Sequence, residues 1–223
     1  MDFYNRLMAE TEEARAEFVS LPIIGRALKG EIPRRLYLDF LSQAYHHVCH
    51  TCPLLALAAV KTENERYRDA LFTYIQEEQG HEQWILEDIR AIGGNAREAA
   101  QARPGVACGL MVAYAYYAVE WISPYALLGM VHVLEGMSVR LADKAAAAIQ
   151  RSFGLDDGKG VRYLRSHGAL DVGHTGFFRS FVNGLDDPAA RDLIIHNAVM
   201  FYRLYGDMFR ELAIRRHEGA DVS

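Results

Sequence analysis

The chain contains no uninterrupted hydrophobic run near the roughly 20 residues that a helix needs to cross a bilayer, although 51% of its 223 residues are hydrophobic. Its first residues carry an acid and lack the apolar region of a signal peptide. Only three cysteines are present, Cys49, Cys52 and Cys108, an odd number that a reducing compartment allows. We therefore expect a cytoplasmic protein with a large core and no membrane partner.

A basic block or stripe is also missing from the sequence. Lys and Arg together number 24 against 29 Asp and Glu, which leaves a formal net charge of −5. The basic residues are scattered among acids at helical spacing, as on solvated helix faces. This pattern excludes the electrostatic footprint of a nucleic-acid-binding protein, so we expect no nucleic-acid partner.

Alternating strand patterns are absent too, because the apolar positions recur with a period near 3.6. With no internal repeat and no linker rich in Pro, Gly or Ser, the sequence predicts one all-α domain over residues 1–223. We expect Ile23 to Leu28 to form a turn and Pro53 to kink the second helix. About seven helices are expected, over residues 3–19, 33–60, 64–92, 106–121, 124–153, 161–181 and 188–216.

The residues suited to metal binding are distributed over three of these helices. Glu78-x-x-His81 places a carboxylate and an imidazole one turn apart, a unit found in di-iron sites of helical bundles. Glu135 lies in an almost wholly apolar segment, where a buried carboxylate needs a cation or hydrogen bonds. An ion pair with Arg140 is the competing explanation. Ser138 occupies the position where a second Glu-x-x-His would require histidine.

A third set can replace that missing histidine. His167, Asp171 and His174 follow an i, i+4, i+7 spacing, which places them on one helical stripe. Such a stripe is either a polar helix face or a set of ligands for a transition metal. With Glu78, His81 and Glu135, the total is three carboxylates and three imidazoles. These ligands can hold two irons and leave positions open for dioxygen.

Taken in order, Glu78-x-x-His81, the lone Glu135 and His167-x-x-x-Asp171-x-x-His174 resemble the haem-oxygenase-like di-iron oxidase superfamily. The pattern is most similar to the branch that contains the chlamydial protein associating with death domains. The resemblance implies a seven-helix bundle shared with TenA (thiaminase II) and pyrroloquinoline-quinone synthase (PqqC). It implies a cofactor of two Fe, or Fe and Mn, with O2 as co-substrate. It also implies oxidation of a small amino acid, amine or fatty acid. Leu134 stands where that branch carries a redox-active tyrosine, so its self-sacrificing chemistry is not expected here.

Two other segments are candidates for substrate contacts. The tract from His46 to Cys52 lacks the second Cys pair of a zinc site, so a cavity-lining role fits it better. We hypothesise that His47 or His50 faces the cavity and binds substrate. Tyr117 belongs to an aromatic cluster with Tyr114, Tyr116 and Trp121, which is either ordinary core packing or a substrate cage.

The leading hypothesis is a metal-dependent oxidoreductase that acts on a small molecule. One alternative is a metal-free TenA/PqqC-like enzyme acting on a thiamin-like or quinone-precursor ligand, for which Cys108 is a candidate nucleophile. Another alternative is a non-catalytic helical module that binds a partner. A homodimer is expected from the size of such a bundle, although no segment of the sequence marks an interface.

Overall fold

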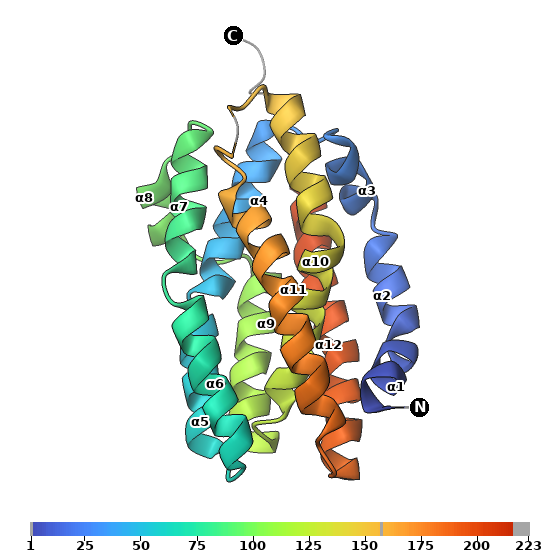
Figure 1. Cartoon of the computed structure of the whole chain (residues 1–223). Helices are drawn as coiled ribbons and strands as arrows, with labels where there is room; N and C mark the ends of the chain where they lie inside the picture. The colour runs from blue at the N-terminus through green and yellow to red at the C-terminus, as the bar shows by residue number, and fades with distance from the viewer. Residues whose placement is uncertain (1, 157, 216–223) are drawn as a thin grey trace.

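The computed structural model describes residues 2–156 and 158–215, without the side chains of residues 167–175 and 177. Within this part the chain forms helices only, and they assemble into one bundle of seven rods (Figure 1). Four rods have two parts: α1 (Phe3–Glu10) with α2 (Glu12–Val19), α4 (Arg34–Val48) with α5 (Thr51–Lys61), α6 (Glu65–Glu78) with α7 (His81–Ala91), and α9 (Val106–Tyr117) with the π-helical turn Ala118–Ile122. Three are continuous: α10 (Ala126–Phe153), α11 (Arg162–Asn183) and α12 (Pro188–Ile214). The predicted all-α single-domain bundle is confirmed.

The interruptions within the rods differ from the predicted continuous helices. The predicted kink at Pro53 is wrong in position, because the chain leaves the helix at Cys49 and His50 and Pro53 lies in the first turn of α5. A proline is tolerated there because the first turn needs no amide donor. The predicted helix over residues 64–92 is broken at Gln79 and Gly80, where Gly80 has a φ of 91° that favours glycine.

A short helix replaces the turn that was expected at Ile23 to Leu28. Helix α3 (Pro22–Lys29) begins on Pro22 and ends at Gly30, whose φ is 75°. A Cβ at Gly30 would lie 2.8 Å from the carbonyl oxygen of Ala148, so only glycine allows this close approach to α10. The connection between the third and fourth rods likewise contains a short helix, α8 (Ala96–Gln101).

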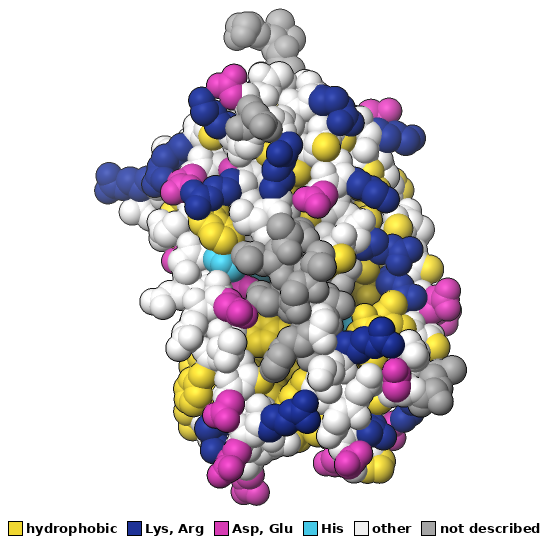
Figure 2. Space-filling model, viewed as in Figure 1, with side chains coloured by type: hydrophobic (Ala, Val, Ile, Leu, Met, Phe, Trp, Pro, Cys, Tyr) yellow, Lys and Arg dark blue, Asp and Glu magenta, His cyan; other side chains and the backbone are white. Residues whose placement is uncertain are grey.

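The core surrounds α10, which packs against both α11 and α12 and lies behind α11 in Figure 1. Basic and acidic side chains are interspersed over the face that α11 occupies (Figure 2). None of the helices in the described part of the chain is long and apolar enough to span a membrane.

Helix α11 is capped at its start by a side chain from another rod. Asp88 on α7 is only 1% exposed, and its carboxylate accepts hydrogen bonds from the backbone N–H groups of Arg162 at 2.9 Å and Tyr163 at 2.8 Å. These two amides belong to the first turn of α11, whose amides have no partner within the helix. Burial raises the pKa of Asp88 to about 6, against the opposing effect of both hydrogen bonds. The contact fixes α11 against α7.

We expect Asp88→Ala to lower the free energy of unfolding by about 2 kcal/mol, because two buried amides lose their acceptor. Chemical denaturation followed by circular dichroism measures the change. Asp143→Ala removes an exposed acid from α10 and serves as the control. Equal stability of the two variants would contradict the capping role of Asp88.

Candidate functional site

Among the described residues, two cavities lie on either side of α10. The first has a volume of about 180 Å³ and extends between α2, α3, α4, α10 and α12 toward α5, α6 and α11. On α10 its walls extend from Leu127 to Ile149, so the cavity is elongated along this helix. From Glu135 to Ile149 alone the distance along the axis is roughly 21 Å at the usual helical rise.

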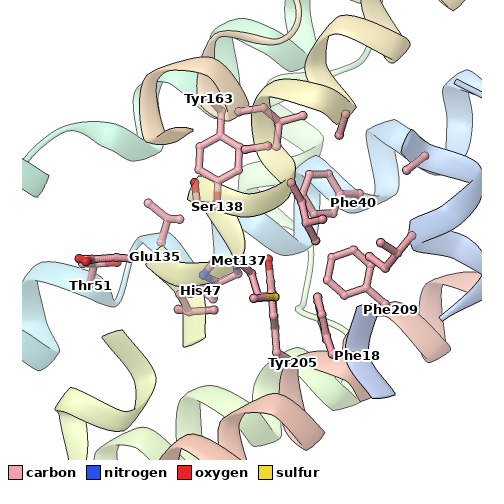
Figure 3. Close-up of a pocket in the computed structure, with 18 of the residues that line it drawn as sticks. Phe18, Phe40, His47, Thr51, Glu135, Met137, Ser138, Tyr163, Tyr205 and Phe209 are labelled. Atoms are coloured by element: carbon pink, nitrogen blue, oxygen red, sulfur yellow. The ribbon is translucent and has the colours of Figure 1, made fainter. Parts of the chain in front are cut away.

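The first cavity has a polar end and an apolar end. The polar end is formed by His47, Thr51, Glu78, Glu135 and Ser138. In Figure 3, Glu135 and Thr51 lie on one side of the cavity and Phe18, Phe40 and Phe209 on the other. The described lining contains no lysine or arginine. A ligand here therefore meets carboxylate, imidazole and hydroxyl groups at one end and hydrocarbon at the other.

Glu78 and His81 meet across the break between α6 and α7. Glu78 is 8% exposed and His81 is 3% exposed, and His81 Nδ1 lies 3.0 Å from Glu78 Oε2. The imidazole ring also stacks on Trp84, with 4.0 Å between the ring centroids. The sequence spacing predicted the proximity of the two groups, but the left-handed turn at Gly80 produces it instead of a continuous helix.

Glu135 projects from α10 into the same cavity as Glu78. Two of the predicted metal ligands thus share one cavity, and His81 joins them through its contact with Glu78. The predicted ligands His167, Asp171 and His174 lie on α11, but their side chains are outside the described part of the structure. Among the described side chains, no group of three or more His, Cys, Asp or Glu residues is arranged to hold a metal ion.

The three predicted substrate contacts are placed differently from one another. His47 is 4% exposed and lines the first cavity. His50 is half-buried at the break between α4 and α5, where its Nδ1 lies 3.0 Å from the Tyr116 hydroxyl, and it does not line the cavity. Tyr117 is 55% exposed on α9 and also does not line the cavity, so the structure does not support it as part of a substrate cage.

Several cavity residues were not anticipated from the sequence. Thr51, Tyr74 and Ser138 each lie three or four residues from His47, Glu78 or Glu135, and all line the cavity. Helical spacing around each candidate residue is the signal that could have identified them. Ser138 Oγ is buried and has no hydrogen-bond partner among the described residues. It is therefore available to a ligand.

Cys108, the candidate nucleophile of the metal-free alternative, is fully buried on α9. Its thiol donates to the carbonyl oxygen of Gln43 at 3.5 Å, and burial raises its pKa to about 11. A thiol that stays protonated at neutral pH is a poor nucleophile. This environment is that of a structural cysteine.

Comparison with known proteins shows the family to which the chain belongs. The model of a haem-oxygenase-type family described as iron-containing redox enzymes matches residues 38–206, which is most of the chain. The chain therefore belongs to this family, and the predicted membership of the haem-oxygenase-like superfamily is confirmed. A search of curated proteins finds no match.

Solved structures share the fold over nearly the whole chain. A domain of unknown function with a haem-oxygenase-like fold from Shewanella denitrificans has a TM-score of 0.83 at 20% identity, covering 100% of this chain and 98% of its own. A TenA homologue from Pseudomonas syringae has a TM-score of 0.81 at 11% identity, with coverages of 95% and 92%. Haem oxygenase-1 from Synechocystis, in complex with haem, has a TM-score of 0.74 at 16% identity, with the same coverages. At these identities the likeness establishes the fold.

One buried histidine near the site has a measurable consequence for stability. His132 on α10 is 6% exposed, and its Nε2 lies 3.4 Å from the Thr11 hydroxyl. Burial lowers its pKa to about 4, with a smaller contribution from the positive charge of Arg15. Below the ordinary pKa of 6.5, the unfolded chain therefore binds a proton that the folded chain does not.

We expect the unfolding free energy of the wild type to fall relative to that of His132→Gln as the pH drops from 6.5 to about 4. The relative loss reaches about 3 kcal/mol at the acid end of this window. Denaturant titrations across the window measure it. His196→Gln removes an exposed histidine from α12 and is the control. Parallel pH profiles for wild type and His132→Gln would contradict the assigned pKa.

Proposed function

We propose that the protein is an iron-dependent oxidase or oxygenase that uses dioxygen to oxidise a small molecule with an aliphatic part. The cofactor is two Fe, or Fe and Mn. Its ligands are Glu78, His81 and Glu135, together with His167, Asp171 and His174 on α11. The observation that carries this proposal is that Glu78 and Glu135 line one cavity, with His81 in contact with Glu78. Membership of a family of iron-containing redox enzymes supports it.

The donor atoms that are described fit a transition metal. Carboxylate oxygen and imidazole nitrogen are the ligand types that non-haem iron takes. His81 Nδ1 and Glu78 Oε2 lie 3.0 Å apart, so the two side chains would hold an ion from adjacent positions on the rod. When bound, iron supplies the electrons that activate dioxygen.

The protein's own residues position the substrate and exclude water. The hydrocarbon walls around Phe18, Phe40 and Phe209 exclude bulk water from the polar end. The Ser138 hydroxyl, which has no partner among the described residues, hydrogen-bonds a polar atom of the substrate. His47 faces the same space from α4. The bond to be oxidised is thereby held beside Glu78 and Glu135.

The family resemblance implies an amino acid, an amine or a fatty acid as substrate. Among these, the shape of the first cavity favours a molecule with an aliphatic chain. Most of the lining away from the polar end is hydrocarbon, which a short, doubly charged amino acid would leave unfilled. A hydrocarbon chain instead gains from the apolar walls along α10, from Leu141 to Ile149. A dry apolar cavity of about 150 Å³ accommodates benzene, so a space of about 180 Å³ has room for a short aliphatic chain.

We expect Glu135→Gln to weaken ferrous iron binding at least about tenfold, because a charged ligand is replaced by a neutral amide. Anaerobic reconstitution followed by metal analysis gives the iron content and the dissociation constant. Oxygen uptake should fall in parallel. Glu98→Gln, at an exposed position on α8, controls for the loss of one charge.

Unchanged iron binding in Glu135→Gln would refute the assigned ligand set. Wild-type protein that takes up no iron, yet keeps an activity insensitive to chelation, would favour the metal-free alternative. Absence of both iron and oxygen uptake would favour a binding module.

We expect Ala145→Phe to shift the preferred substrate toward shorter chains while leaving iron content unchanged. Ala145 lines the apolar end and follows Glu135 by roughly 15 Å along α10. Oxygen uptake with straight-chain carboxylates and amines of increasing length measures the preference. Ala147→Phe adds the same ring at a half-buried position outside the described lining. An identical length profile in the two variants would contradict this use of the cavity.

A further inference from the structure

The second cavity lies on the opposite side of α10 from the first and differs from it in charge. Its volume is about 280 Å³, it is bordered by α1, α2, α10, α11 and α12, and it reaches the surface at Val139 and Arg140. The described residues that line it are Tyr4, Met8, Arg15, Val131, His132, Glu135, Gly136, Met137, Val139, Arg140, Phe178 and Tyr202. Val131, Glu135 and Met137 also line the first cavity, so α10 is a shared wall.

Two arginines line the second cavity, Arg15 on α2 and Arg140 on α10. Neither forms an ion pair with a described carboxylate, whereas many other arginines of the chain do. Arg15 is held in place by the carbonyl oxygen of Met8, which accepts a hydrogen bond from its Nη1 at 3.2 Å. This hydrogen bond fixes the orientation of the half-buried Arg15 side chain, and no described carboxylate neutralises its charge.

The effects of both arginines on neighbouring groups place them together. Burial raises the pKa of Tyr202, and a hydrogen bond from Arg15 and the charges of Arg15 and Arg140 oppose that rise. His132 is uncharged at neutral pH because its pKa is about 4. The charged side chains of the described lining are thus Arg15, Arg140 and Glu135, with Glu135 shared by both cavities.

We infer that the second cavity is a binding site for a small organic carboxylate with an apolar body. Guanidinium groups match the planar, two-oxygen geometry of a carboxylate. The hydroxyls of Tyr4 and Tyr202 are further donors, and Met8, Val139 and Phe178 offer apolar surface to the rest of the molecule. The site adjoins Glu135, so the carboxylate binds on the opposite side of α10 from the first cavity.

The experiment uses the full-length, metal-free protein, so its outcome is independent of iron chemistry. Para-fluorobenzoate is titrated and its binding followed by fluorine NMR. We expect saturable binding that weakens about tenfold in Arg15→Gln and in Arg140→Gln, because each removes a charged hydrogen-bond donor. Arg97→Gln, at an exposed position on α8, should bind as the wild type does. Para-fluorobenzamide, the neutral counterpart, should not bind.

The inference would be overturned by no saturable binding of the carboxylate, by equal binding of the amide, or by wild-type affinity in both cavity variants. Displacement by inorganic phosphate at equal concentration would refute a carboxylate-selective site. Arg140 is exposed, so its substitution keeps the test decisive should Arg15→Gln fail to fold. Circular dichroism and thermal melting verify the fold of each variant.

Discussion

The placement of buried carboxylates on the rod formed by α6 and α7 determines how the rest of the site is arranged. A carboxylate inside an apolar bundle is stable only with hydrogen-bond or cationic partners. Glu78 contacts His81 across the break in the rod, and Asp88 accepts the first two amides of α11. One rod therefore presents Glu78 to the cavity and also fixes the start of α11, which carries the candidates His167, Asp171 and His174.

Helix α10 divides the interior into two chemically different spaces. On one side the described lining is hydrocarbon with a polar end, and on the other side two arginines face a cavity beside aromatic and sulfur-containing side chains. Glu135 reaches both spaces from the shared wall. The proposed apolar substrate and the inferred organic anion require opposite environments, and the two sides of α10 supply them.

Helical periodicity was sufficient to predict the seven rods, because each apolar stripe reports which face of a rod is buried. It could not predict where the rods are interrupted. The break at Gly80 depends on a left-handed turn, and the break at His50 places Pro53 in a first turn. Glycine and proline are also tolerated at other positions of a helical chain, so the sequence alone does not determine where the rods break.

The same limits apply to the candidate site. Glu78, His81 and Glu135 were identified by spacing and by apolar context, and the fold brings Glu78 and Glu135 to one cavity. Tyr117 was a less successful candidate, since α9 carries apolar side chains on its exposed face as well as its buried one. Arg15 and Arg140 come to one cavity only because α2 and α10 both pack against α12, which no local pattern records.

The most direct test of the account is a crystal structure of the protein loaded anaerobically with ferrous iron, with anomalous scattering recorded at the iron absorption edge. We expect anomalous peaks at the polar end of the first cavity, within bonding distance of Glu78, His81 and Glu135. Iron bound elsewhere, for example at the exposed acids or at Cys49 and Cys52, or no anomalous peak in that cavity, would contradict it.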